Sequence, residues 1–246
     1  MKQKVNVQNM KTNLLKWRFA GAVILLFLLS GCLKSGDPVT PTPKAYISIL
    51  HLAPTAPSLD VYFNENRVSN APFTPGSVTA GYNTVDKGSF SIKFKKIGTD
   101  SLVAEIPMSQ YDSLSFYTLF IHNLDENGPA KATRIRDSFT GLDQTKSYYR
   151  FYHGSPNAGN IDLYIDNVKI SSDRVNGDNT INAFLNNFEG ISSGVHTIEV
   201  KTAGTDTVLT SLVVDLFQGN AYTFYLKGLK GGTGNSILSL GNLRAN

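Results

Sequence analysis

At residues 51–62 the chain reads HLAPTAPSLDVY, and at residues 153–164 it reads HGSPNAGNIDLY. The second stretch follows the first at a distance of 102 residues (153 minus 51), without a gap. Both stretches keep a histidine, a proline, an aspartate and a tyrosine at the same places, namely His51, Pro54, Asp60 and Tyr62 in the first and His153, Pro156, Asp162 and Tyr164 in the second. A repeat at this distance predicts a duplicated domain, because it matches the usual length of one domain.

Short runs rich in Val, Ile, Thr, Tyr and Phe surround both stretches and are bounded by Gly, Pro, Asn or Asp. In Phe90-Ser91-Ile92-Lys93-Phe94-Lys95 apolar and polar side chains alternate, which is typical of a strand with one buried and one solvated face. No stretch shows a sustained helical period. We expect strands near 45–52, 58–64, 78–84, 89–97, 101–106, 114–123 and 131–138, and in the second copy near 147–153, 160–165, 180–188, 195–201, 207–214, 220–227 and 235–241.

Glycines mark the turns of both copies. A Gly-Thr-Asp turn occurs at 98–100 and again at 204–206, which is an offset of 106, so four residues are inserted near 173–179 of the second copy. An insertion there predicts a surface loop. Later in each copy, Leu216, Gly219 and Tyr222 have the spacing of a tyrosine corner, and the first copy has Leu114 in place of the glycine.

About seven strands per copy predict an all-β protein of two tandem immunoglobulin-like antiparallel β-sandwich domains. We expect the first sandwich at 45–140 and the second at 146–244, joined by a short polar linker. Such a linker predicts two sandwiches arranged end to end like beads.

The repeated block, the glycine-led strand at 88–92, the Gly-Thr-Asp turn and the closing Tyr-Thr strand together resemble the bacterial domain-of-unknown-function family 4397. The resemblance covers nearly all of 46–242, as two copies. It implies β-sandwich modules of secreted and cell-envelope proteins, often lipoproteins, with no established activity. The first copy departs from the family pattern at Pro57, where the second copy has Gly159.

The N-terminus has the pattern of an export signal. Five basic residues and no acid precede an apolar run at 19–29, which is near half the length needed to span a bilayer as a helix. The run ends in Leu29, Ser30 and Gly31 before Cys32, which resembles a bacterial lipobox. We therefore expect a lipoprotein signal peptide at 1–31, lipidation of Cys32 and a proline-rich spacer at 32–44. The expected location is the cell envelope, as an outer-membrane lipoprotein that faces the periplasm or the surface.

Removal of the signal changes the charge of the protein. The full chain has 23 basic and 19 acidic residues, and 5 of the basic ones precede Cys32, so the mature chain carries 18 against 19, a net charge of −1. This balance argues against nucleic acid as a partner, because no basic excess remains. Cys32 is the only cysteine, so the domains are expected to fold without disulfides.

His51, His153, Asp60 and Asp162 are the chemically versatile residues that both copies keep. One histidine and one aspartate per copy are too few for a zinc site, so we expect no metal and no cofactor. We predict a structural role instead, in which each histidine ends the first strand and hydrogen-bonds the proline loop, and each aspartate caps the amides of that loop.

Two further patterns suggest other functions. Gly190-Ile191-Ser192-Ser193-Gly194 fits the G-x-S-x-G pattern of serine hydrolases, but a strand follows it where that motif needs a helix. Tyr148, Tyr149, Tyr152 and Tyr164 could line a sugar-binding surface. The leading hypothesis is a non-enzymatic interaction or structural module, anchored in the membrane by lipid, whose partners are envelope proteins or glycans. The alternative is a glycan-binding accessory surface lipoprotein, and a hydrolase is third.

Overall fold

The computed structural model describes residues 42–245. The predicted signal peptide at 1–31, the lipobox residues Leu29, Ser30 and Gly31, the lipidation site Cys32 and most of the spacer lie outside the described residues. Pro43–Asn246 forms one compact unit. None of the helices within the described residues has the length and apolar character needed to cross a bilayer.

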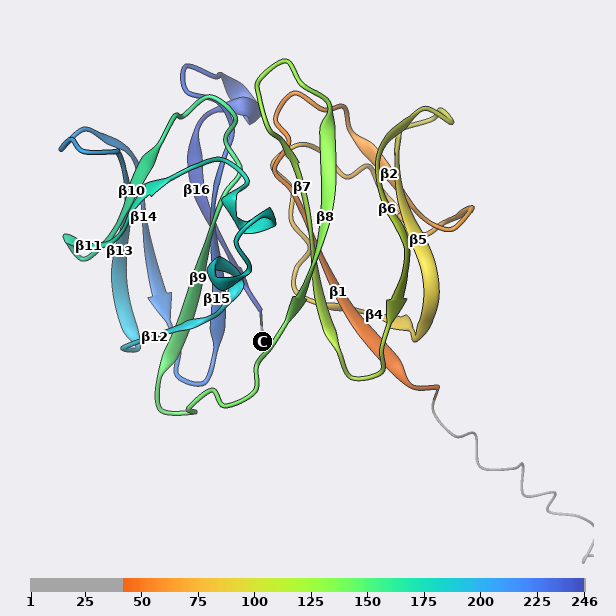
Figure 1. Ribbon diagram of the computed structural model, residues 1–246, viewed down its shortest axis with the longest axis horizontal. Helices are drawn as coiled ribbons and strands as arrows, with labels where there is room; N and C mark the ends of the chain where they lie inside the picture. Colours follow the sequence, from red (N-terminus) through yellow and green to blue (C-terminus); the bar gives the residue numbers. More distant parts are fainter. Residues whose placement is uncertain (1–41, 246) are drawn as a thin grey trace, which may run out of the picture. The chain divides into compact units, whose positions relative to one another are not determined.

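The described residues form an all-β protein with three single-turn 3₁₀ segments (Figure 1). The first repeat contains β1 (Lys44–His51), β2 (Leu59–Phe63), β3 (Asn66–Arg67), β4 (Asn83–Asp86), β5 (Gly88–Lys96), β6 (Leu102–Tyr111), β7 (Phe116–Asn123) and β8 (Ala130–Asp137). The second contains β9 (Ser147–His153), β10 (Ile161–Ile165), β11 (Val168–Arg174), η1 (Asp178–Thr180), η2 (Ala183–Asn186), β12 (Glu189–Ile191), β13 (Gly194–Thr202), β14 (Val208–Leu216), β15 (Ala221–Lys227), η3 (Gly234–Ser236) and β16 (Ser239–Arg244).

Each repeat consists of two four-stranded sheets. The sheets of the first repeat have the strand orders β4-β1-β7-β8 and β3-β2-β5-β6, and those of the second have the orders β12-β9-β15-β16 and β11-β10-β13-β14. The prediction of purely antiparallel sheets is wrong, because β1 pairs with β7 and β9 pairs with β15 in parallel. After β1 the chain returns to this sheet at the edge strand β4, crosses to the other sheet for β5 and β6, and comes back beside β1 at β7. Such a long crossover allows the neighbouring strands β1 and β7 to run in the same direction. These mixed sheets do not confirm an immunoglobulin-like topology.

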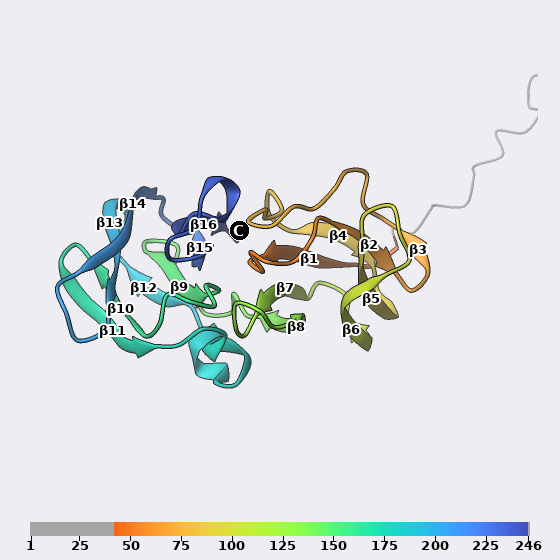
Figure 2. The same cartoon turned by 90° about the horizontal axis from the view of Figure 1, so that it is seen from above.

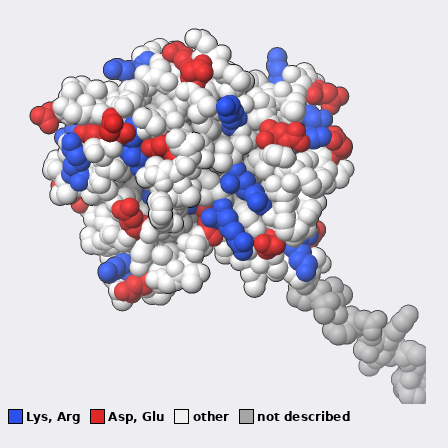
Figure 3. All heavy atoms as spheres, in the orientation of Figure 1, with Lys and Arg blue, Asp and Glu red and all other residues white. Residues whose placement is uncertain are grey.

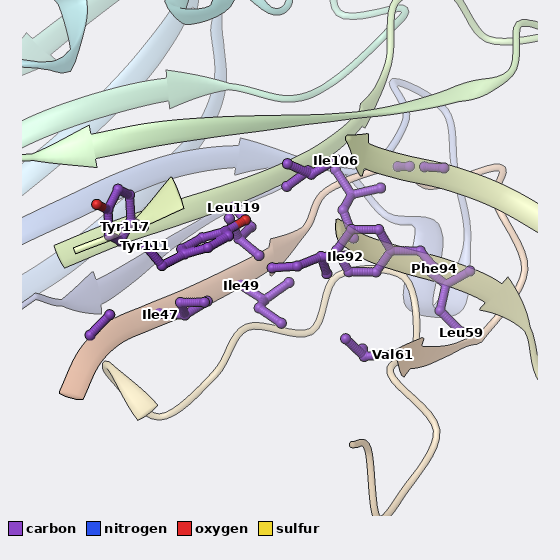
Figure 4. Close-up of a cluster of buried hydrophobic side chains, with 14 residues drawn as sticks. Ile47, Ile49, Leu59, Val61, Ile92, Phe94, Ile106, Tyr111, Tyr117 and Leu119 are labelled. Atoms are coloured by element: carbon purple, nitrogen blue, oxygen red, sulfur yellow. The ribbon is translucent and has the colours of Figure 1, made fainter. Parts of the chain in front are cut away.

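Each repeat has its own hydrophobic core between its two sheets. In the first repeat Ile47 and Ile49 of β1 pack with Leu119 of β7 and with Ile92 and Phe94 of β5 (Figure 4). In the second repeat the corresponding cluster includes Tyr149 and Phe151 of β9. The alternating residues that predicted these strands therefore supply the inward-facing side chains.

The predicted strand near 180–188 is wrong, because this segment forms η1 and η2 instead. The inserted residues are also not a solvated loop, since Arg174, Asp178 and Asn179 are buried. The Arg174 guanidinium donates to both carboxylate oxygens of Asp178, at 2.5 and 2.9 Å, and to the Phe151 carbonyl oxygen at 3.1 Å. The amide of Asn179 donates to the Phe151 carbonyl oxygen at 3.2 Å. These side-chain bonds hold a compact turn where apolar alternation alone suggested a strand.

The two repeats share a buried interface. The outer faces of β1 and β7 pack against those of β9 and β15, through a cluster of Leu50, Leu52, Phe120, Ile135, Tyr152, Tyr225 and Leu243. Figures 1 and 2 show β7 and β8 beside the second repeat from two directions. The central strands are consequently buried on both faces, and every residue of β9 is buried.

A fully buried ion pair crosses this interface. The side chains of Arg150 in the second repeat and Asp137 in the first form a salt bridge, and both have an exposed fraction of 0%. Arg150 also donates to the hydroxyls of Thr223 at 2.9 Å and Thr118 at 3.0 Å, while Tyr82 donates to Asp137 at 2.6 Å. Burial alone would lower the pKa of Arg150, but the Asp137 carboxylate more than offsets this effect, so the guanidinium stays charged. The prediction of two sandwiches arranged end to end like beads is therefore wrong, because the repeats share a buried interface.

Candidate functional site

The two histidines of the repeated block lie at equivalent corners. Nε2 of His51 at the end of β1 lies 3.2 Å from the Pro57 carbonyl oxygen, and Nε2 of His153 at the end of β9 lies 3.0 Å from that of Gly159. The Ser155 amide donates to Nδ1 of His153, at 3.3 Å, so Nε2 carries the proton and donates to the loop. The expected bond between histidine and loop is therefore present in both repeats, although Pro57 and Gly159 differ.

Both histidines are neutral at pH 7. Burial lowers the pKa of His51 to about 4, although the bond to Pro57 opposes this effect, and burial also lowers the pKa of His153. In His153 both ring nitrogens are engaged, because Nδ1 accepts from the Ser155 amide and Nε2 faces the Gly159 carbonyl, so its imidazole has no free lone pair for a metal. Nδ1 of His51 is buried and has no described partner. Within residues 42–245 no group of three or more His, Cys, Asp or Glu side chains is placed to hold a metal ion.

The two aspartates of the block form hydrogen bonds outside the proline loop, where we expected their partners. Asp162 accepts hydrogen bonds from the amides of Asp173 at 3.0 Å and Gly204 at 3.2 Å, and from Lys169 Nζ at 2.7 Å. Asp60 accepts from Arg67 at 2.7 Å and from the amide of Gly98 at 3.4 Å. The prediction that these aspartates cap the proline loop is wrong, because they join the Gly-Thr-Asp turn to the edge hairpin instead. The histidine and the aspartate of one block share no described bonding partner.

Tyr62 and Tyr164, the tyrosines of the block, are half-buried and lie beneath lysines. The Nζ of Lys95 lies 4.7 Å from the ring centroid of Tyr62, and that of Lys201 lies 4.3 Å from that of Tyr164. Both arrangements have the geometry of a cation–π contact. Pro54 is half-buried and Pro156 lies in the equivalent loop.

The G-x-S-x-G segment does not form a serine–histidine pair. His196 is buried, its Nδ1 lies 2.6 Å from Asp166 Oδ2, and its Nε2 lies 2.9 Å from the carbonyl oxygen of Ser192. Activation of a serine requires Nε2 to accept the proton of its hydroxyl. Because Nε2 faces the backbone carbonyl of Ser192, this imidazole instead ties the turn before β13 to the turn after β10.

The tyrosines proposed for sugar stacking do not form an exposed platform. Tyr148, Tyr149 and Tyr152 are buried, and Tyr152 lies within the cluster that joins the repeats. The Tyr148 hydroxyl accepts from the amide of Asp143, at 2.6 Å, and the Tyr149 hydroxyl donates to Glu189 at 2.9 Å. Stacking on a sugar ring needs a free aromatic face, which these three residues do not offer.

The first repeat contains a cavity that no sequence pattern predicted. Its volume is about 830 Å³, and it opens between β1 and β4 of one sheet and β2 of the other. Its apolar lining includes Ile47, Ile49, Phe63, Phe73 and Phe90. A volume of this order is typical of small-molecule sites. The signal that could have revealed it is the comparison of the two copies, because the second has larger residues at the positions of both isoleucines.

Charges of both signs cover the described surface. On the face shown in Figure 3, acidic and basic side chains are interspersed. The exposed ion pairs of the described residues include Lys44 with Asp86 at 2.6 Å and Arg136 with Asp112 at 3.5 Å. Exposed pairs of this kind contribute little to stability but balance the local charge.

Comparison with known proteins places the sequence without naming an activity. The family model described as "Domain of unknown function (DUF4397)" matches residues 45–164 and again residues 147–239. A search of curated proteins found no match.

Proposed function

The chain belongs to the DUF4397 family of domains of unknown function and carries two tandem copies of its domain, and on this premise we propose a non-enzymatic interaction or structural module of the cell envelope. Acylated Cys32 anchors it in the outer membrane, on the periplasmic or the outer side. Each copy acts as an immunoglobulin-like sandwich in the broad sense of two packed sheets. Envelope proteins or glycans are its partners, and nucleic acid is not.

One observation carries this proposal. The histidines and aspartates of the repeated block, and His196, are each engaged in internal hydrogen bonds that support a turn or a strand end. His153 and His196 have described partners at both ring nitrogens. Side chains committed in this way stabilise the fold and are poorly placed to transfer protons to a substrate.

The anchor is tested by replacing Cys32. We expect labelled palmitate to be incorporated into the full-length protein in cells and to be absent from Cys32→Ala, because Cys32 is the residue that carries the lipid. Persistence of label in Cys32→Ala would contradict the lipobox assignment. Protease treatment of intact cells then distinguishes the two sides of the outer membrane, since only an outward-facing module is digested.

The hydrolase hypothesis has its own test. Ser192 is exposed on a turn, and its Oγ has no described hydrogen bond to His196. We expect no turnover of ester or amide substrates that depends on this serine. Turnover by the wild type that Ser192→Ala abolishes would contradict the non-enzymatic proposal. The glycan alternative is tested on a glycan array. Binding that is lost when the half-buried Tyr164 is replaced would support a sugar site at this tyrosine, whereas binding that persists would place the sugar site on another surface.

A further inference from the structure

The cavity of the first repeat reaches from the surface to the hydrophobic core. Ile47 and Ile49 of β1 and Val61 of β2 line it and are buried members of the core cluster (Figure 4). Phe63, Phe73 and Phe90 are partly buried against the same cluster. An apolar ligand that entered between the two sheets would therefore contact core side chains directly.

The second repeat fills the corresponding space with its own side chains. Ile47 lies opposite Asn83 in the β1–β4 pair, and Tyr149 occupies the same place opposite Glu189 in the pair of β9 with β12. Phe151 likewise corresponds to Ile49, because Ile49 pairs with Leu119 and Phe151 pairs with Phe224 in the equivalent parallel ladders. The first repeat thus has two isoleucines where the second repeat packs two aromatic rings. Because protein interiors are close-packed, the volume left by the smaller side chains is an unusual feature.

The edge strand beside this cavity is also shorter in the first repeat than in the second. In the second repeat β11 is seven residues long and pairs along β10, whereas β3 has only two residues. His196, which corresponds to Phe90 at an offset of 106, ties two turns together in the second repeat. The first repeat lacks the histidine tie, and within residues 42–245 the backbone of the segment after β3 bonds to that of β2 only at Val61 and Leu59. The cavity lies beside this segment, whose residues Val68 to Ala71 and Phe73 line it.

The charged residues that line the cavity have a small positive excess. Lys44, Asp86 and Lys87 are the charged residues among those that line it, and their formal charges sum to +1. Lys44 is paired with Asp86 at 2.6 Å, while the exposed side chain of Lys87 has no described partner among residues 42–245. The amide side chains of Asn64, Asn66 and Asn70 also line the cavity and add hydrogen-bond donors. An apolar interior with a small positive excess among its lining residues is complementary to a molecule that has an apolar tail and one negative charge.

We propose that the first repeat binds a single-chain anionic amphiphile, with its alkyl chain between the two sheets and its carboxylate at Lys87. The second repeat is the filled copy and does not bind. This site is separate from the acyl anchor at Cys32, so the two proposals can fail independently.

The direct test uses dodecanoate as the probe. The fragment 33–246 contains the whole compact unit Pro43–Asn246 and lacks Cys32. We expect one molecule of dodecanoate to bind per chain in titration calorimetry below its micellar concentration, and dodecyltrimethylammonium to bind at least fivefold more weakly. Absence of dodecanoate binding, or equal affinity for the cationic probe, would overturn the proposal.

The decisive variant places the residues of the second repeat in the first. Ile47→Tyr combined with Ile49→Phe fills the cavity with side chains that the same fold accommodates in the other copy, where Tyr149 and Phe151 hold these positions. We expect the affinity for dodecanoate to fall at least tenfold while the near-UV circular dichroism stays that of a folded protein. Undiminished binding by the folded double variant would place the ligand elsewhere.

A second variant avoids the core. Val68 lines the cavity with 43% of its surface exposed, and Ile170 is its counterpart in the second repeat with 38% exposed. We expect Val68→Glu to weaken dodecanoate binding at least fivefold through repulsion of the carboxylate, and Ile170→Glu to leave it unchanged. Similarly, Lys87→Gln should weaken dodecanoate binding, while Lys96→Gln should not. Equal effects of the paired variants would contradict a site in the first repeat.

Discussion

Leu114 and Gly219 occupy the same place before a tyrosine corner in the two repeats. The Tyr117 hydroxyl accepts from the amide of Asp112 at 3.0 Å, and the Tyr222 hydroxyl accepts from that of Phe217 at 3.1 Å. Both turns need left-handed backbone, with φ of 56° at Leu114 and 73° at Gly219. Only glycine adopts this conformation without steric cost. Leu114 is therefore strained, whereas the second repeat has glycine at the same position.

We expect Leu114→Gly to stabilise the protein by about 1 kcal/mol, because relief of the left-handed strain exceeds the added entropy of the unfolded chain. The leucine side chain is 74% exposed, so little burial is lost. Urea unfolding measures the change. Leu114→Ala is the control, since it removes the side chain and keeps the strain. A lower stability for Leu114→Gly than for the wild type would show that leucine makes contacts that outweigh the strain.

Buried histidines make stability depend on pH. Burial lowers the pKa of His51 from 6.5 to about 4, and burial together with Lys131 lowers that of His122 to about 4. Below pH 6.5 the unfolded chain therefore binds protons that the folded chain does not bind until about pH 4. Stability is fully present above pH 6.5 and is lost as the pH falls toward 4, by up to about 3 kcal/mol for each histidine.

This pH dependence is measured by urea unfolding at intervals between pH 7 and 4. His51→Gln keeps a donor for the Pro57 carbonyl and removes the titration, so we expect this variant to lose less stability over the interval than the wild type. An equal loss in both would show that His51 already binds a proton in the folded state near pH 6.5.

At the scale of elements, the aspartate of each repeated block joins an edge hairpin to the Gly-Thr-Asp turn. The Asp162 carboxylate lies at the start of β10, and it accepts from the amide at the end of β11 and from the amide in the turn after β13. Hydrogen bonds from Lys169 and from the amide of Asp173 lower the pKa of Asp162. Three strands of one sheet are thus held at one buried side chain.

We expect Asp162→Ala to lower the free energy of unfolding by about 1 to 3 kcal/mol, because the amides of Asp173 and Gly204 lose their acceptor. Thermal or urea unfolding measures the loss. Asp206→Ala is the matched control, since Asp206 is exposed in the same Gly-Thr-Asp turn. Similar effects of the two substitutions would mean that the turn, and not the buried carboxylate, carries the stability.

At the scale of the whole molecule, the interface makes the two repeats one folding unit. Arg150 and Asp137 are fully buried, and the donors and acceptors around them come from both repeats. Replacing one of these two residues leaves a buried charge without its counter-ion, whereas replacing both leaves no buried charge unpaired. The repeats are therefore expected to unfold together.

We expect a single calorimetric transition, and we expect Arg150→Met to lower stability by about 3 to 5 kcal/mol. The double variant Arg150→Met with Asp137→Leu should recover most of this loss. Lys44→Met serves as the control because the pair of Lys44 with Asp86 is exposed, and its loss should cost less than about 1 kcal/mol. Two separate transitions, with only one moved by Arg150→Met, would support independent beads.

Local sequence patterns predicted the secondary structure well where side chains alternate along a strand. β5 and β13 form close to the predicted bounds, because alternate side chains of each strand face the core. η1 and η2 were missed because Asn179 and Arg174 bind the Phe151 carbonyl, a contact that is remote in sequence. The Asp60 and Asp162 partners were missed for the same reason, since strand pairing brings Gly98 and Gly204 to them.

The sequence by itself determined the duplication, the all-β class and the corner at each histidine, because these depend on residues that are near in the chain or repeated at a fixed offset. Only the tertiary structure decided the parallel pairing of β1 with β7, the ion pair between repeats and the open cavity. Each of these depends on which face of a strand meets which neighbour. A period of two says that a strand has two faces, but it does not say whether water, a second repeat or a ligand covers the outer one.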